Sequence, residues 1–176
     1  QVDIDELLEA LIIAKSAQIN TNIQELSSLY LAKVDIVRVV NAKKMAKNSG
    51  YPVPFAILAE HYLAGGNIEK TVDAYVSAKK ANLPNFEFED IANIDLAGYD
   101  VVDSVERAIA PFVVETDGVR GIARDGVELT MKVKVTLRAF IKNIIGGLDE
   151  QTVLARVNEG LATEIGLATT HYDVLQ

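Results

Sequence analysis

The chain has 176 residues with a formal net charge of −8, and about half of its residues are hydrophobic (49%). This length and composition are typical of a globular chain that forms one generous domain or two small ones. The acidic balance argues against a nucleic-acid partner, which needs a clustered basic surface. The absence of cysteine excludes disulfides, thiolate nucleophiles and cysteine-ligated zinc.

The first hundred residues repeat about every 32 positions. The marks are Ala-Lys pairs ending at Lys15, Lys47 and Lys79, and Leu-Ala pairs that begin at Leu31, Leu63 and Leu96. Such a period is typical of a helical hairpin that cannot bury its own apolar face and therefore stacks on copies of itself. The apolar spacing predicts helices that begin near Ile4, Asn22, Asp35, Phe55, Ile68, Phe86 and Asp100.

Turn and capping residues separate these predicted helices. Thr21 or Asn22 can cap the second helix, and Asn67 can cap the fifth. Gly65-Gly66 precedes Asn67, and glycine there suits the left-handed end of a helix. A phosphate-binding turn at Gly65-Gly66 is the alternative, but the surrounding sequence lacks the glycine or lysine context of such loops. We therefore favour a helix stop.

After Pro111 the apolar period changes from helical to alternating. Strands are predicted over residues 112–115, 119–124 and 127–139, with Asp125-Gly126 as a strong hairpin signal. The third segment alternates apolar and polar residues throughout, which predicts an antiparallel sheet with one buried face. Gly146-Gly147 ends this region, and an apolar stripe predicts a helix from about Glu150 to Ile165.

The predicted fold class is therefore α+β. Stacked helical-hairpin repeats of about 32 residues fill residues 1–108, and a small antiparallel sheet with a covering helix fills residues 109–176. The sequence contains no run of about 18 apolar residues, the length that spans a bilayer. It begins at Gln1 with neither an initiator methionine nor a signal pattern, so we expect a fragment of a longer protein.

Several linked motifs resemble the bacterial flotillin-like protein A family. They occur in family order over roughly residues 34–175, and the second half resembles the stomatin/prohibitin/flotillin (band-7) domain. The stretches that carry the resemblance are residues 62–67 (Tyr-Leu-Ala-Gly-Gly-Asn), 77–82, 94–98, 125–127, 135–139 and 155–160 (Ala-Arg-Val-Asn-Glu-Gly). Residues 2–33 form an additional repeat unit where the tail of the family's membrane anchor is expected.

The resemblance implies a membrane-associated scaffold and not an enzyme. Members of this family are anchored by an N-terminal hydrophobic segment, form large homo-oligomers and are linked to membrane microdomains. The expected partners are copies of the chain itself and membrane proteins, and no cofactor is expected. The parent is expected on the cytoplasmic side of the cell membrane, with this fragment soluble.

The lysines at the repeat position, Lys15, Lys47 and Lys79, are the first candidate site. If the units stack, these side chains form a row that can meet an anionic lipid surface, with each lysine contributing on the order of 1 kcal/mol. Alternatively, they complement the dipole of each helix C-terminus and remain solvated. We favour the second interpretation because the repeat position coincides with the predicted helix ends.

The candidate assembly surfaces lie at the open end of the stack and at the strand edge. An open-ended stack exposes apolar residues of its first unit, here Leu7 and Leu11 with their neighbours. A strand edge around Phe112 and Val114 offers a second route by edge pairing. The alternative function is a helical-repeat adaptor that binds a protein or peptide on its concave face.

No catalytic or metal site is predicted. His61 is interpreted as a structural or surface residue, because His171 is the one other histidine in the sequence and no His-x-x-x-His pattern occurs. Serines such as Ser27 and Ser104 lack a histidine partner in the local pattern that would activate them.

Overall fold

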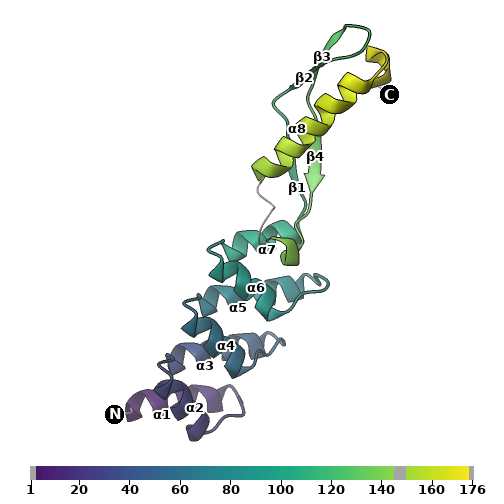
Figure 1. Ribbon diagram of the computed structural model, residues 1–176. Helices are drawn as coiled ribbons and strands as arrows, with labels where there is room; N and C mark the ends of the chain where they lie inside the picture. The colour runs from purple at the N-terminus through teal and green to yellow at the C-terminus, as the bar shows by residue number, and fades with distance from the viewer. Residues whose placement is uncertain (1–2, 145–149, 175–176) are drawn as a thin grey trace. The chain divides into compact units, whose positions relative to one another are not determined.

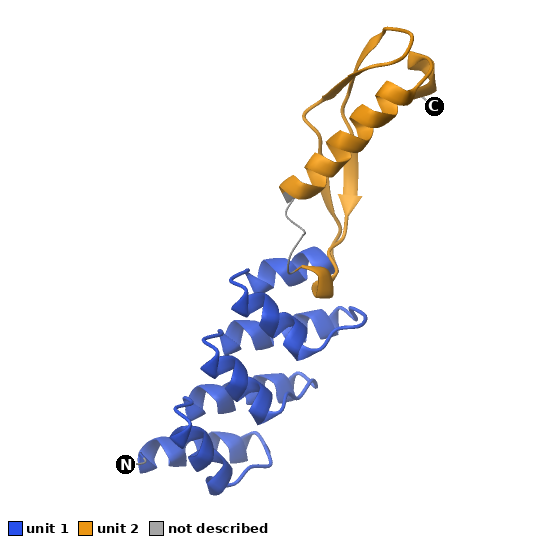
Figure 2. Ribbon diagram, in the orientation of Figure 1, with its two compact units in different colours: residues 1–109 blue, residues 110–176 orange. Residues whose placement is uncertain are grey.

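A computed structural model describes residues 3–144 and 150–174 and shows an α+β protein, which confirms the predicted fold class. The chain forms two compact units, residues 1–109 and 110–176, called here unit 1 and unit 2 (Figure 2). Helices make up unit 1, whereas unit 2 contains strands followed by a long helix. The predicted break at Gly146-Gly147 lies outside the described residues.

Unit 1 consists of helices that alternate between two layers of the stack. The odd-numbered helices pack side by side, α1 on α3, α3 on α5 and α5 on α7, and each even-numbered helix packs on the odd-numbered helix before it (Figure 1). Helices α1, α3 and α5 begin at isoleucines 32 residues apart. The helices are α1 (Ile4–Ser16), α2 (Ile23–Leu31), α3 (Ile36–Asn48), α4 (Phe55–Leu63), α5 (Ile68–Lys80), α6 (Phe88–Leu96) and α7 (Val101–Ile109).

Side-chain caps fix where these helices begin. Asn22 Oδ1 accepts a hydrogen bond from the amide of Glu25 (2.9 Å), and Asn67 Oδ1 accepts one from the amide of Lys70 (3.1 Å). Both caps were predicted and are confirmed, and they satisfy amides that the first turn leaves without a helical acceptor. Gly65 lies two residues after the end of α4 and has a φ of +89°. This is the left-handed conformation that glycine adopts without steric cost.

Small residues let the odd-numbered helices approach each other closely. Ala10, Ala42 and Ala74 occupy equivalent positions in α1, α3 and α5, and all three are buried. Branched side chains fill the spaces beside them, and each fully buried one stabilises the fold by about 2 kcal/mol. Those with almost no exposed surface include Ile36, Val39, Val40, Leu58, Ile68, Val72, Ile91 and Ile94.

Unit 2 is built on two antiparallel strand pairs. Strand β1 (Phe112–Glu115) pairs with β4 (Lys134–Leu137), and β2 (Val119–Ile122) pairs with β3 (Glu128–Met131). The predicted single strand over residues 127–139 is therefore wrong, since it divides into β3 and β4.

The division of that strand has a local cause in the facing segment. Gly118 lies in the segment that connects β1 to β2 and adopts a φ of +112°. This turn takes the connecting segment out of the ladder with residues 127–139. Thr116 bridges the gap: its amide donates to the carbonyl of Val133 (3.0 Å), and its hydroxyl accepts from the amide of Val133 (2.9 Å). A buried threonine side chain thus replaces one rung of backbone pairing.

Helix α8 (Glu150–Leu167) packs mainly on β2, which confirms the predicted covering helix. Ile165 is its most buried described side chain, and it lies against the backbone of Gly121. A Cβ at Gly121 would lie 2.7 Å from Ile165 Cγ2, so glycine is required for this approach. Two short 3₁₀ helices, η1 (Ile141–Asn143) and η2 (His171–Val174), complete the unit.

Candidate interaction surfaces

The lysine row lies in the last turns of three neighbouring helices, but its members differ in their contacts. Lys47 Nζ donates to the carbonyl of Ala17 (2.9 Å) and also contacts the carbonyl of Gln18, so it joins α3 to the loop after α1. Lys79 Nζ donates to the carbonyl of Phe86 (3.1 Å). Lys15 is exposed at the end of α1. Two of the three ammonium groups therefore donate hydrogen bonds that connect a helix to a loop.

Lys43 also connects a helix to a loop, a contact that the sequence pattern did not predict. Its Nζ donates to the carbonyl of Val53 (2.8 Å) and lies 4.3 Å from the centre of the Phe55 ring. Burial lowers the pKa of Lys43, an effect that the charge of Glu25 opposes. The ammonium group stabilises the start of α4 through the carbonyl and the ring face.

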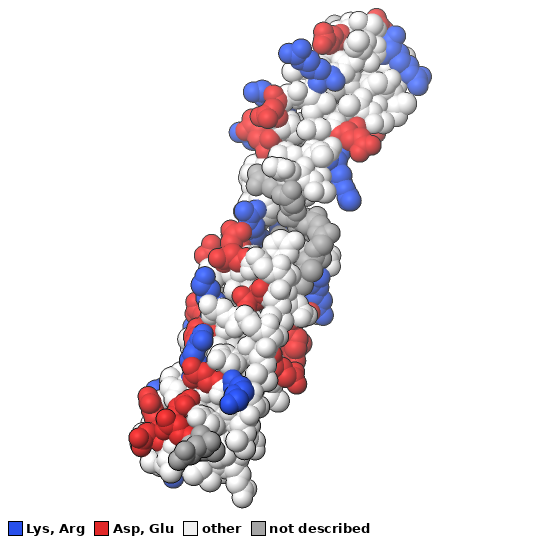
Figure 3. Space-filling model, turned by 60° about the vertical axis from the view of Figure 1, so that its left-hand side comes forward, with Lys and Arg blue, Asp and Glu red and all other residues white. Residues whose placement is uncertain are grey.

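Charge is mixed over the surface that Figure 3 shows. Blue and red side chains alternate along unit 1, without a large area of a single sign on that face. Unit 1 includes an ion pair of this kind between Arg38 in α3 and Glu69 in α5, with 2.7 Å between Arg38 Nη2 and Glu69 Oε2. Intermixed charges weaken attraction to an anionic lipid surface, because each lysine near a carboxylate loses part of its field.

Helix α1 exposes an apolar strip. Leu7 is buried and Leu11 is half-buried, so both pack toward the neighbouring helices. Ile4, Leu8 and Ile12 are the exposed apolar side chains of this helix. We call these three residues the end strip, and they are the neighbours of Leu7 and Leu11 that a partner would contact.

A second exposed apolar feature repeats along unit 1. The last residues of α2, α4 and α6 are Leu31, Leu63 and Leu96, and their exposed fractions are 69%, 53% and 44%. We call these three residues the leucine edge. Helix ends do not require leucine, and each of these side chains would be buried by a partner that spans successive units.

The strand edge in unit 2 presents one exposed apolar residue. Phe112 is half-buried and Val114 is buried, whereas Val113 between them is exposed. Among the described residues, β1 pairs with β4 alone and β2 with β3 alone, so each strand has one edge without a paired strand. Such edges can accept a strand from another chain.

A buried polar cluster joins α4, α5 and α6. The His61 side chain in α4 is 2% exposed, and its Nε2 lies 3.0 Å from both Thr71 Oγ1 in α5 and Asp95 Oδ2 in α6. Asp95 Oδ2 also accepts from the amide of Asn67 (2.6 Å), and the Thr71 hydroxyl donates to the carbonyl of Asn67 (2.8 Å). The interpretation of His61 as structural agrees with these contacts.

His61 is held as the neutral imidazole with its proton on Nε2. Nδ1 is buried and has no hydrogen-bond partner, so a proton on Nδ1 would be an unsatisfied buried donor. Burial lowers the pKa of His61, although the charge of Asp95 opposes that change. Gly66 lies directly against the ring, which explains why the second glycine of the pair is needed. No spacing rule in the sequence links His61, Thr71 and Asp95.

Unit 2 contains a comparable but more exposed pair. His171 Nδ1 lies 2.8 Å from Asp125 Oδ2, which also accepts from the amide of His171 (2.9 Å). These hydrogen bonds from His171 lower the pKa of Asp125 to about 2. The pair joins the β2–β3 turn to η2, so both histidines of the chain make structural contacts.

Residues 3–144 and 150–174 contain no group of three or more His, Cys, Asp or Glu side chains arranged to hold a metal ion. Across the same residues, no helix has both the length and the apolar character needed to cross a membrane.

Comparison with known proteins adds independent information. The family model "Flotillin-like protein FloA" matches residues 4–176. The expectation that residues 2–33 are an addition to the family pattern is therefore wrong, because the match begins within the first helix. No solved structure is significantly similar to the chain.

Curated relatives from several bacteria agree with the family model. The chain is 38% identical to the flotillin-like protein FloA of Alkaliphilus metalliredigens over 165 residues and 40% identical to that of Dictyoglomus turgidum over 166 residues. It is 37% identical to the flotillin-like protein FloA of a Staphylococcus aureus strain over 165 residues. Each comparison covers 94% of the chain and 50% of the relative, so the chain spans about half the length of these relatives. The chain belongs to the flotillin-like protein FloA family.

Proposed function

We propose that this chain is part of a non-enzymatic, membrane-associated scaffold that self-associates and organises membrane microdomains on the cytoplasmic side of the cell membrane. Its partners are copies of itself and membrane proteins. Family membership supports the proposal, and one structural observation carries it: unit 1 buries its internal apolar surface but leaves the end strip and the leucine edge exposed.

The end strip supports self-association on physical grounds. A helical repeat with an apolar face that is not covered continues the stack or associates with another surface. Ile4, Leu8 and Ile12 give α1 such an exposed apolar face among the described residues. Burying them against another chain removes apolar area from water at about 25 cal/mol per Å².

The polar clusters support a role without chemistry. His61 is buried against Phe88, with its ring 6.1 Å from the Phe88 ring centre, and its Nε2 is used by Thr71 and Asp95. A general base must reach a substrate proton within hydrogen-bond distance, and the buried His61 ring, whose Nε2 already contacts Thr71 and Asp95, is not placed for that task. His171 contacts Asp125 through Nδ1, and this contact joins the β2–β3 turn to η2.

The leucine edge favours a second function, that of an adaptor. Three leucines at equivalent positions would suit an extended peptide with apolar residues at matching intervals. In that case unit 1 would bind one defined protein or peptide ligand, and the chain alone would remain a monomer. The two functions therefore differ in the mass of the isolated chain.

Light scattering after size-exclusion chromatography tests the scaffold. We expect the mass of the chain to exceed that of a monomer, and we expect Ile12→Asp to lower it because the substitution places a charge in the end strip. Val127→Asp is the control, since Val127 is an exposed apolar residue in the turn between β2 and β3, outside the candidate assembly surfaces. A wild-type chain that remains monomeric throughout would contradict the scaffold and favour the adaptor.

A further inference from the structure

Two of the three residues of the end strip lie at repeat positions that the later units bury completely. Ile4 is 69% exposed and Leu8 is 46% exposed. Their equivalents one and two repeats later have an exposed fraction of 0%: Ile36, Val40, Ile68 and Val72. Helices α3 and α5 each pack on the odd-numbered helix before them, whereas the described residues place no helix before α1 (Figure 1). The end strip therefore has the character of a surface that packs on another helix.

The charges of α1 are separated along the helix. Asp5 lies in its first turn and Lys15 in its last turn. The series Asp5, Leu8, Ile12 and Lys15 is spaced by three, four and three residues, which places the four side chains on one stripe of the helix. Asp5 and Lys15 are exposed, and among the described residues neither side chain forms a hydrogen bond or an ion pair. The stripe is therefore apolar at its centre, acidic at one end and basic at the other.

This stripe is complementary to itself when two copies of α1 lie antiparallel. In an antiparallel pair, residues equally far from the crossing point oppose each other. If the helices cross level with Ala10, Leu8 of each copy faces Ile12 of the other, and Asp5 faces Lys15 at both ends. The two helix macrodipoles then also point in opposite directions. A parallel pair would instead place Asp5 against Asp5 and Lys15 against Lys15, so the pattern fits an antiparallel copy.

Other surfaces fit the end strip less well. An anionic lipid surface would be repelled by the carboxylates at the start of α1, which belong to Asp3, Asp5 and Glu6. The leucine edge places one exposed leucine at the end of each of three helices, so it offers no apolar stripe along a helix. The strand edges of unit 2 present backbone groups that pair with a strand rather than with a helix.

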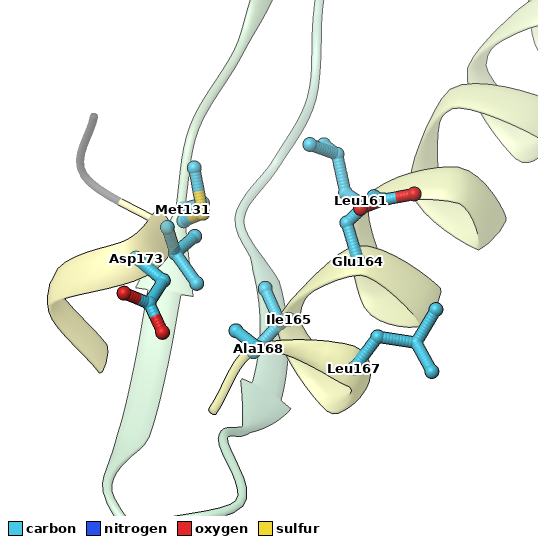
Figure 4. Close-up of a pocket in the computed structure, with 8 residues that line it drawn as sticks. Met131, Leu161, Glu164, Ile165, Leu167, Ala168 and Asp173 are labelled. Carbon is cyan, nitrogen blue, oxygen red and sulfur yellow. The ribbon is translucent and has the colours of Figure 1, made fainter. Parts of the chain in front are cut away.

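The pocket of unit 2 is too small to receive the length of α1. It lies near the end of α8 and has a volume of about 390 Å³ (Figure 4). A helix of 13 residues is about 20 Å long and about 10 Å wide, so its volume is several times larger. Figure 4 also shows Glu164 and Asp173 at this pocket, and their carboxylates would repel the acidic first turn of α1.

We propose that two copies of this chain pair through α1, with the two helices antiparallel and related by a two-fold axis. This inference rests on the proposed self-association and specifies one contact that produces it. Because the two end strips cover each other, this contact closes at a dimer, and further assembly needs other surfaces. Three apolar side chains per copy make an interface of the small, weak class, so we expect a dissociation constant in the micromolar range or above.

The absence of cysteine permits a direct test of the direction and register of the pair. Chains carrying Leu8→Cys are mixed with longer, tagged chains carrying Ile12→Cys, and the disulfide between the two sizes is followed under mild oxidation. The antiparallel pair places these positions opposite each other, so this product should form several times faster than the product of Leu8→Cys with tagged Leu8→Cys. Equal rates, or faster formation of the second product, would overturn the inference.

Charge substitution tests the two ends of the stripe. Asp5→Lys alone and Lys15→Glu alone each place like charges against each other, so each variant should dimerise several times more weakly than the wild type at low salt. An equimolar mixture of the two variants restores opposite charges at both ends and should associate more strongly than either variant alone. Mixing cannot repair a chain that has failed to fold, and circular dichroism checks the fold of each variant.

Asp73→Lys is the matched control for the change in net charge. Asp73 is exposed on α5, outside the end strip, so this variant should dimerise like the wild type. A mixture of Asp5→Lys and Lys15→Glu chains that associates no better than the separate, folded variants would overturn the inference.

Sedimentation velocity across a concentration series separates this inference from the proposed function. If the wild type associates and neither Asp5→Lys nor Lys15→Glu changes that association, the α1 contact is wrong while the scaffold stands. If the wild type is a monomer at every concentration, the contact and the self-association of this chain both fail.

Discussion

Gly66→Ala tests whether the polar cluster at His61 holds unit 1 together. A Cβ at Gly66 would overlap His61 Cε1 and Nε2 and would lie 2.7 Å from Nδ1. The ring cannot retreat freely, because Phe88 lies edge-on to it and Thr71 and Asp95 contact Nε2. Overpacking of this kind costs about 1–3 kcal/mol, and displacement of the ring from its hydrogen-bond partners adds about 1–3 kcal/mol.

We therefore expect Gly66→Ala to lower the free energy of unfolding by about 3 kcal/mol. Urea unfolding followed by circular dichroism of the helices measures this change. Gly65→Ala is the matched control: its φ is +89° and no atom lies within 4 Å of the added Cβ, so the cost is backbone strain of about 1 kcal/mol.

A double-mutant cycle isolates the contact between the two residues. In a His61→Ala background the ring is gone, so Gly66→Ala should cost less than about 1 kcal/mol. The resulting coupling of about 2 kcal/mol would assign the requirement for glycine to the imidazole. An equal cost of Gly66→Ala with and without the ring would refute the reasoning.

Three further predictions follow from the same structure. The pKa of His61 is lowered, so the folded state binds the proton less readily than the unfolded state. The free energy of unfolding should therefore reach its full value above pH 6.5 and fall as the pH drops below that value. In urea titrations at several pH values, His61→Gln should lose this dependence of stability on pH. The pKa of Asp125 is lowered to about 2, so its contribution is present above pH 3.8 and lost as the pH falls toward 2; Asp125→Asn should unfold at lower temperature and lack that acid limb in a pH series of melting curves. Lys47→Met should reduce the free energy of unfolding in urea by about 1 kcal/mol, because its bonds to carbonyls are lost. Lys15→Met should leave stability unchanged, because Lys15 is exposed, and should also leave flotation with phosphatidylglycerol vesicles unchanged. A clear loss of flotation in Lys15→Met would instead assign Lys15 to a lipid contact.

Local signals in the sequence predicted most of the helices and their ends. Asn22 and Asn67 cap helices because their short polar side chains reach backbone amides two or three residues ahead, a property that needs no tertiary information. Gly65 likewise occupies a left-handed position that its residue type indicates. The alternation of residues 128–137 predicted which side chains face water.

Features that depend on packing between elements were beyond the sequence. The strand over residues 127–139 divides because Gly118, in the facing segment, turns away from the ladder and Thr116 bridges to Val133. The apolar residues of α1 also did not indicate which face of the helix is buried. Leu7 and Leu8 are equally apolar, and the position of α3 decides which of the two is buried.

The candidate sites show the same limit. The sequence placed the three lysines at the helix ends where the structure has them, but it did not indicate which carbonyls they reach. Lys47 contacts carbonyls in a loop 29 and 30 residues before it, and Lys79 contacts a carbonyl in a loop 7 residues after it. The cluster of His61, Thr71 and Asp95 depends on the angles between three helices. Residue spacing alone does not encode those angles.

Sedimentation velocity of the wild-type chain across a hundredfold range of concentration tests the central claim most directly. The account predicts a weight-average sedimentation coefficient that rises with concentration, because the end strip of α1 and the unpaired strand edges of unit 2 both offer surfaces to further copies. A coefficient that stays at the monomer value over the whole range would contradict the claim that this chain builds a scaffold through its own contacts.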